Sequence, residues 1–107
     1  MQELQVNKEN CFSVLMAVYK KEQPLFFKEA LRSVFEQSLI PNEVVLVKDG
    51  PLTEELEQII VDFSSKNEQL KVITLEKNQG LGEALRIGLN ACSFDLVARM
   101  DSDDICK

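Results

Sequence analysis

The chain of 107 residues contains no histidine and no tryptophan, and its three cysteines follow no metal-binding spacing. Without histidine, the chain itself offers neither a histidine-based catalytic triad nor an imidazole ligand for a metal ion. The odd number of cysteines, Cys11, Cys92 and Cys106, indicates reduced thiols rather than a disulfide framework. We therefore expect a cytoplasmic protein, at the inner face of the membrane if its parent protein meets one.

The chain also lacks a long apolar run and a cluster of basic residues. No segment reaches the length of a membrane-spanning helix, and the polar segment 1–10 lacks the apolar core of a signal peptide. We expect a flexible tail over 1–10 and one domain over 11–107. The net charge of −6, from 12 basic and 18 acidic residues, argues against nucleic acid as a partner. A negative protein that handles a negative ligand needs local compensation, such as a metal ion.

The hydrophobic pattern predicts four short strands that alternate with three helices. The strands are short apolar runs, which are typical of strands buried on both faces, over residues 12–19, 44–47, 70–75 and 94–100. The first helix is expected to begin near Pro24 and to end before Pro41, and the second is expected to be capped by Thr53. The third helix is expected to carry five residues along one side, namely Leu81, Leu85, Gly88, Leu89 and Cys92. A close approach of this helix to the sheet would explain the glycine at position 88.

This β-α-β-α-β-α-β order predicts an α/β fold with a parallel, Rossmann-like open sheet. Right-handed crossovers place helices on both faces of such a sheet. If the strands lie in the order 3-2-1-4, the sheet reverses its direction of growth between the first and fourth strands. A crevice then forms outside the carboxyl ends of these strands. The loops that end the four strands, near residues 18–20, 48–50, 77–79 and 99–103, would meet there.

The segment Asp101-Ser102-Asp103-Asp104 follows the last predicted strand and is the strongest functional signal in the sequence. Three carboxylates in four positions repel one another, and a hard divalent cation would balance them because it prefers oxygen ligands. A solvated acidic turn is the alternative, since aspartate is common in turns. The position at the predicted crevice, directly after Arg99 and Met100, favours the cation site.

Three further residues are expected at the same crevice. Asp49 is either a turn residue or a carboxylate that accepts hydrogen bonds from a base N–H or a ribose hydroxyl. Tyr19, the only tyrosine, is either a strand-end aromatic with a wetted hydroxyl or a flat face for a stacked base. Asn78 either caps the third helix or reaches a ligand. Gly80-Leu81-Gly82 is not a dinucleotide fingerprint, because Leu85 stands at the third glycine position and the motif follows the third strand.

Taken together, these segments resemble the family 2 glycosyltransferases, which have a GT-A fold and use nucleotide-sugar donors. The resemblance covers about residues 12–106. It rests on four segments in the order typical of the family, Ser13-Val14-Leu15-Met16-Ala17-Val18-Tyr19, Val45-Leu46-Val47-Lys48-Asp49-Gly50, Asn78-Gln79-Gly80-Leu81-Gly82 with Ala84 and Gly88, and Asp101-Ser102-Asp103. The chain departs from the common pattern at Ala17, Lys20 and Lys48, where proline, asparagine and an acid are frequent.

The resemblance implies a nucleotide site and a metal site that share the predicted crevice. The implied nucleotide site consists of Val18, Tyr19, Asp49, Asn78, Arg99, Asp101 and Ser102. The first two would flank the base, Asp49 would contact the base or the ribose, and Arg99 would orient the acids. Asp101 and Asp103 would form the Asp-x-Asp motif, in which Asp103 holds Mn²⁺ or Mg²⁺ and Asp101 touches the ribose or the metal.

By the same resemblance, the parent enzyme would transfer a sugar with inversion from a nucleotide donor, expected to be UDP-linked, to a glycan or lipid-linked glycan during surface polysaccharide biosynthesis. The acceptor site and general base of this family lie beyond the Asp-x-Asp motif, so we expect no catalytic residue in this truncated GT-A chain and no turnover by it. The alternative is a non-enzymatic nucleotide- or cation-binding β/α module. A receiver-like phosphoacceptor domain is disfavoured, because it needs acids after the first strand. The outer edge of the fourth strand, beside Leu96 and Val97, is expected to promote self-association.

Overall fold

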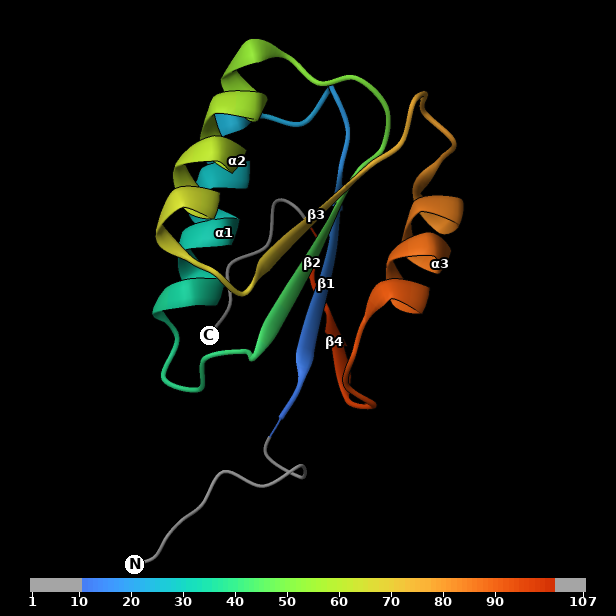
Figure 1. The fold of residues 1–107 in the computed structure, drawn as a ribbon. Coiled ribbons are helices and arrows are strands. Elements are labelled where there is room, and N and C mark those ends of the chain that lie inside the picture. Colours follow the sequence, from blue (N-terminus) through green and yellow to red (C-terminus); the bar gives the residue numbers. More distant parts are fainter. Residues whose placement is uncertain (1–10, 102–107) are drawn as a thin grey trace, which may run out of the picture.

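The computed structural model describes residues 11–101, which form an alternating series of strands and helices (Figure 1). The strands are β1 (Ser13–Val18), β2 (Glu43–Lys48), β3 (Leu70–Thr74) and β4 (Val97–Arg99), and the helices are α1 (Pro24–Glu36), α2 (Glu54–Lys66) and α3 (Leu81–Ala91). All strand pairs are parallel and the order is β3-β2-β1-β4, which confirms the predicted α/β fold and strand order. The expected tail over 1–10 lies outside the described residues, as do Ser102 and Asp103.

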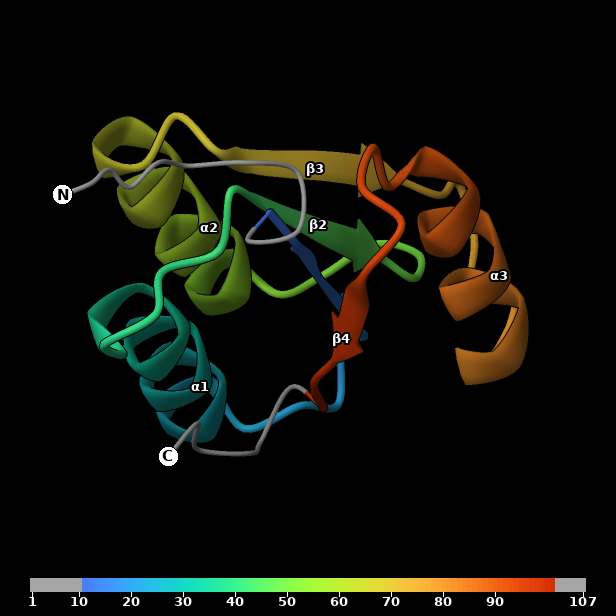
Figure 2. The same ribbon diagram turned by 90° about the horizontal axis from the view of Figure 1, so that it is seen from below.

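Helices cover both faces of the sheet, as predicted: α1 and α2 lie together on one face and α3 lies on the other (Figure 2). Side chains alternate along a strand, so β1 sends Val14 and Met16 toward α1 and α2, and Leu15 and Ala17 toward α3. Every residue of β1 is buried, which explains the continuous apolar run in its sequence. None of the helices within 11–101 is long and apolar enough to cross a bilayer.

The start of α2 follows the prediction from the sequence. Thr53 accepts a hydrogen bond from the backbone N–H of Leu56 at 3.2 Å, which satisfies a donor that the first helical turn leaves unpaired. Glu54, Glu55 and Glu57 place negative charge at the positive end of the helix dipole. These signals fix where the loop after β2 ends, and that loop forms one wall of the candidate site.

The predicted side of α3 is only partly buried. Leu81 and Leu89 each leave 52% of their surface exposed, while Ala84 and Gly88 form the buried part of the helix. Gly88 permits a close approach to the sheet, because a Cβ at this position would lie 2.7 Å from Cγ2 of Val47. The helix is buried at Ala84 and Gly88, Leu85 packs partly buried against the same cluster, and Leu81 and Leu89 are left outside it.

The edge strand β4 is shorter than predicted, since it begins at Val97 rather than near residue 94. It pairs with β1 from Ser13 onward, and the backbone N–H of Met100 extends the pairing by donating to the carbonyl of Leu15 at 2.9 Å. Leu96, just before the strand, is 61% exposed. The pairing carries the residues after β4 to the carboxyl edge of the sheet. Self-association through β4 stays a prediction.

A buried carboxylate lies at the opposite, amino edge of the sheet. Glu43 is 2% exposed and accepts hydrogen bonds from the Ser13 hydroxyl at 2.6 Å and from the Ser93 backbone N–H and hydroxyl at 2.7 and 2.9 Å. The Lys71 ammonium also pairs with it. Burial raises the pKa of Glu43, but the hydrogen bonds from Lys71, Ser13 and Ser93 outweigh this effect and lower the pKa to about 2. The cluster ties β1, β2, β3 and the turn before β4 together.

Candidate functional site

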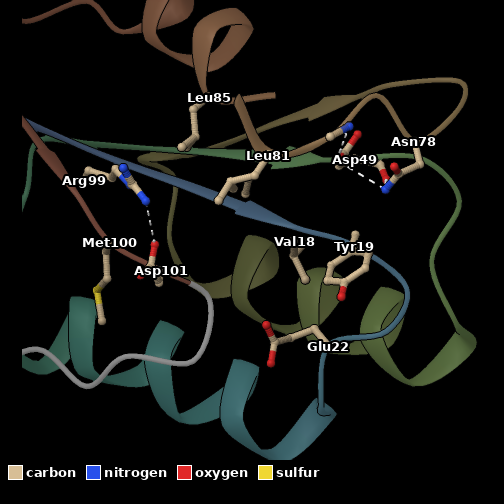
Figure 3. A pocket seen from close by; sticks show the side chains of 12 residues that line it. Val18, Tyr19, Glu22, Asp49, Asn78, Leu81, Leu85, Arg99, Met100 and Asp101 are labelled. Atoms are coloured by element: carbon tan, nitrogen blue, oxygen red, sulfur yellow. Dashed lines mark hydrogen bonds and ion pairs between the residues drawn. The ribbon is translucent and has the colours of Figure 1, made fainter. Parts of the chain in front are cut away.

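A cavity of about 410 Å³ opens at the carboxyl edge of the sheet, among the ends of β1 and β4, the loops after β2 and β3, and the start of α3 (Figure 3). The described residues of the implied nucleotide site all line this cavity, and they are Val18, Tyr19, Asp49, Asn78, Arg99 and Asp101. The structure therefore brings together side chains from four separate segments of the chain. Ser102 and Asp103, the other two implied site residues, lie outside the described residues.

Asp49 forms the wall of the cavity after β2 and is 4% exposed. Its Oδ1 accepts the backbone N–H of Gln79 at 2.7 Å, and its Oδ2 accepts the backbone N–H of Gly80 at 3.1 Å and the side-chain amide of Asn78 at 3.3 Å. These donors satisfy a buried charge that would otherwise be costly. Because a carboxylate has about four acceptor positions, Asp49 keeps capacity for one further donor.

Gly50 joins the loop after β2 to the loop after β3. Its φ of +91° suits glycine, and a Cβ there would lie 2.6 Å from the backbone nitrogen of Asn78. The Asn78 side-chain amide also donates to the backbone carbonyl of Asp49 at 3.2 Å. Asn78 therefore links the two loops. It does not cap α3, whose N-cap is Gly80, so that alternative is wrong.

Arg99 and Asp101 form the side of the cavity that follows β4. Arg99 Nη2 donates to Asp101 Oδ1 at 3.3 Å, and the two side chains are 58% and 51% exposed (Figure 3). Water screens such an exposed pair, so the contact contributes little to stability. Unlike Asp49, these two groups are not fixed by the fold and can exchange their partners for a ligand.

The described lining of the cavity is negative, because it holds the acids Glu22, Asp49 and Asp101 and a single base, Arg99. An anionic ligand would therefore need a cation to accompany it. Within 11–101, no three acidic or cysteine side chains gather closely enough to hold a metal ion. Asp101 offers one carboxylate of the kind that Mn²⁺ and Mg²⁺ prefer, so the donor chemistry fits such a cation, and Asp103 lies outside the described residues.

The sequence analysis did not place all of the lining residues at the crevice, and Glu22, Leu81 and Leu85 are the larger side chains among those it missed. Glu22 belongs to the turn after β1, where its backbone N–H donates to the carbonyl of Tyr19 at 3.0 Å, and its side chain lies on the cavity (Figure 3). Leu81 and Leu85 reach the cavity from α3. Helical spacing placed both leucines along one side of the helix, and only the glycines on either side of Leu81 distinguish that position in the sequence.

Comparison with known proteins identifies the family to which the chain belongs. Residues 13–107 match the family described as Glycosyl transferase family 2, and the chain belongs to this family. It is 52% identical over 94 residues to UDP-Gal:alpha-D-GlcNAc-diphosphoundecaprenol beta-1,3-galactosyltransferase of Escherichia coli, covering 88% of this chain and 34% of that protein. It is 45% identical over 95 residues to the amylovoran biosynthesis glycosyltransferase AmsE of Erwinia amylovora, covering 89% and 35%. The chain thus spans about a third of the length of these relatives.

Solved structures agree with the family assignment. Residues 1–349 of S. aureus TarS superpose with a TM-score of 0.75 at 33% identity, covering 89% of this chain and 28% of that one, and TarS has also been solved with UDP and with UDP-GlcNAc. The mannosyltransferase PcManGT of Pyrobaculum calidifontis, solved with GDP-Man and Mn²⁺, matches with a TM-score of 0.75 at 20% identity. This second likeness shows the fold alone. The predicted family and the GT-A type of fold are both confirmed.

Lys48 stands at a position where, by the family resemblance, an acidic residue is frequent. Its Nζ pairs with Oε1 of Glu57 on α2 at 2.8 Å, its side chain is 15% exposed, and it does not line the cavity. The departure therefore adds an ion pair between β2 and α2 and leaves the described lining unchanged.

Proposed function

We propose that this chain supplies the donor-binding part of an inverting glycosyltransferase, which transfers a sugar from a UDP-linked donor to a glycan or lipid-linked glycan in surface polysaccharide biosynthesis. One observation carries the proposal: the six described residues of the implied nucleotide site surround a single cavity at the carboxyl edge of the sheet. Two relatives support the pathway and the donor, since one is named for UDP-Gal and an undecaprenol-linked acceptor and the other for amylovoran biosynthesis.

In this proposal the residues of the chain bind and orient the donor. Tyr19, which is 44% exposed, offers a ring face to the base. Asp49 offers its remaining acceptor capacity to a base N–H or a ribose hydroxyl. Arg99, which pairs with Asp101 at the cavity, is placed to donate charge-assisted hydrogen bonds to a phosphate.

Asp101 and Asp103 are the residues that would hold Mn²⁺ or Mg²⁺. The negative lining of the cavity favours this assignment. Arg99 is the one basic residue in the described lining, and a cation would supply the further positive charge that a diphosphate needs. When bound, the cation stabilises the charge that develops on the departing nucleoside diphosphate. We assign the acceptor site and the general base to parts of the parent protein outside this chain, which by itself is proposed to be inactive.

The metal assignment predicts that replacement of Asp103 abolishes metal-dependent nucleotide binding. Calorimetric titration of UDP should show about tenfold tighter binding with Mn²⁺ than without it, and Asp103→Ala should remove this gain because a ligand of the cation is lost. Asp95→Ala is the matched control, since this exposed aspartate precedes β4 at the opposite edge of the sheet. Equal metal-dependent affinity for UDP in the unmodified chain and in Asp103→Ala would contradict the assignment.

A further inference from the structure

Leu81 occupies a position that the packing of the protein does not explain. It is the first residue of α3 and is 52% exposed, and it belongs to neither of the two apolar clusters of the described core. Leu85, one turn later, does pack against the cluster beneath α3. A large apolar side chain that lines a cavity without contributing to the core is typical of a ligand-binding wall.

Leu81 has a glycine on each side. Gly80 has a φ of +97°, a backbone conformation that by itself favours glycine. An added Cβ at Gly82 would meet nothing within 4 Å beyond its chain neighbours and the backbone of its own helix. Gly82 lies inside α3, where glycine weakens a helix relative to alanine, and no close packing of described residues requires it there. The glycine at position 82 therefore leaves space beside Leu81.

The opposite side of the same cavity carries an aromatic ring. Figure 3 shows Leu81 reaching in from α3, with Tyr19 and Val18 across the cavity and Asp49 at its end. The cavity thus combines two apolar surfaces that face one space with a carboxylate that has one acceptor position left. A nucleobase has the matching chemistry, with two flat apolar faces and N–H groups along its edge. A sugar ring or a diphosphate would place hydroxyls or charge against the leucine methyl groups.

We infer that Leu81 is a base-binding residue that packs against one face of the donor's nucleobase, while Tyr19 covers the other face and Asp49 accepts a ring N–H. The inference rests on the proposed function, because it assumes that the cavity binds a nucleotide. It adds a residue that the family resemblance did not assign, and it assigns the wall formed by α3 to recognition of the base.

The test compares two leucines of the same helix. Leu81 and Leu89 are equally exposed at 52%, but only Leu81 lines the cavity. Leu81→Ser should weaken the binding of uridine about fivefold, because a half-exposed leucine loses the apolar area that the base would cover. Leu89→Ser should bind uridine as the unmodified chain does. Binding of inorganic pyrophosphate with Mg²⁺ should be the same in all three, since pyrophosphate has no base.

The geometry is tested independently by NMR of the leucine methyl groups in the unmodified chain. Millimolar uridine should shift the methyl signals of Leu81 and leave those of Leu89 in place, which does not depend on the folding of any variant. Unshifted Leu81 signals, or equal weakening by Leu81→Ser and Leu89→Ser, would overturn the inference. The pyrophosphate titration separates this failure from a failure of the proposed function. If only the role of Leu81 is wrong, metal-dependent binding of pyrophosphate persists. If the proposed function is wrong, that binding is absent.

Discussion

Replacing Asp49 with asparagine should lower the free energy of unfolding by about 2 to 3 kcal/mol, because one carboxylate satisfies donors on both of its oxygens. In the folded protein, Oδ1 accepts the Gln79 N–H, and Oδ2 accepts the Gly80 N–H and the Asn78 amide. Whichever way the new amide turns, its NH₂ group faces a backbone donor at one of these positions. The substitution should therefore release the loop after β3 and also weaken the binding of UDP.

Two comparisons make this prediction specific. Urea denaturation should show a smaller loss of unfolding free energy for Asn78→Ala, which removes only the longer hydrogen bonds of 3.2 and 3.3 Å. Asp62 is exposed, so Asp62→Asn should lower the free energy of unfolding hardly at all. The amide signals of Gln79 and Gly80 should move in NMR spectra of Asp49→Asn. If this variant keeps its stability and these signals stay in place, Asp49 does not hold the loop.

Replacing Glu43 with glutamine should have the second large effect, at the other edge of the sheet. The fall in the pKa of Glu43 from 4.5 to about 2 corresponds to roughly 3 kcal/mol in favour of the charged folded state. Lys71 is 55% exposed and water screens its charge, so we expect Glu43→Gln to cost about 2 kcal/mol at neutral pH. Chemical denaturation at pH 7 measures this value. Glu29→Gln, which breaks an exposed pair with Arg32, should leave stability nearly unchanged.

The same carboxylate sets a dependence on pH. Because the folded-state pKa lies below the ordinary value of 4.5, the contribution of Glu43 is fully present above pH 4.5 and is lost as the pH falls toward about 2. The stability of the unmodified protein should therefore decline through this window more steeply than that of Glu43→Gln. Parallel stability curves for the two proteins between these pH values would show that Glu43 is not responsible.

The architecture could be predicted from the sequence because local patterns determine it. Thr53 marks the start of α2 through its own hydrogen bond to that helix, and the unbroken apolar run of β1 already indicates a strand buried on both faces. The α3 helix was harder to predict. Its apolar residues satisfied helical spacing in more than one rotation, and the choice depended on how closely Gly88 lets the helix approach Val47. The glycine inside the helix indicated such an approach, but spacing alone does not specify which of the neighbouring leucines it leaves exposed.

In the candidate site, too, some features could be predicted from the sequence and others depend on the tertiary structure. The position of Asp49 and Asp101 at one cavity followed from the rule that parallel strands end at the same edge. The partners of Asp49 did not follow, because they come from a loop about thirty residues away whose backbone conformation the sequence does not specify. The Glu43 cluster was missed for a similar reason: its serine partners, Ser13 and Ser93, are 30 and 50 residues distant in the chain.

One NMR titration tests most directly whether a nucleoside diphosphate binds at the carboxyl edge. Backbone amide signals of the chain should be followed while UDP and Mg²⁺ are added together. We predict that the signals of Tyr19, Asp49 and Asp101 shift, and that those of Glu43 and Ser93 at the amino edge do not. Shifts confined to the amino edge or to the outer surfaces of the helices would contradict the account.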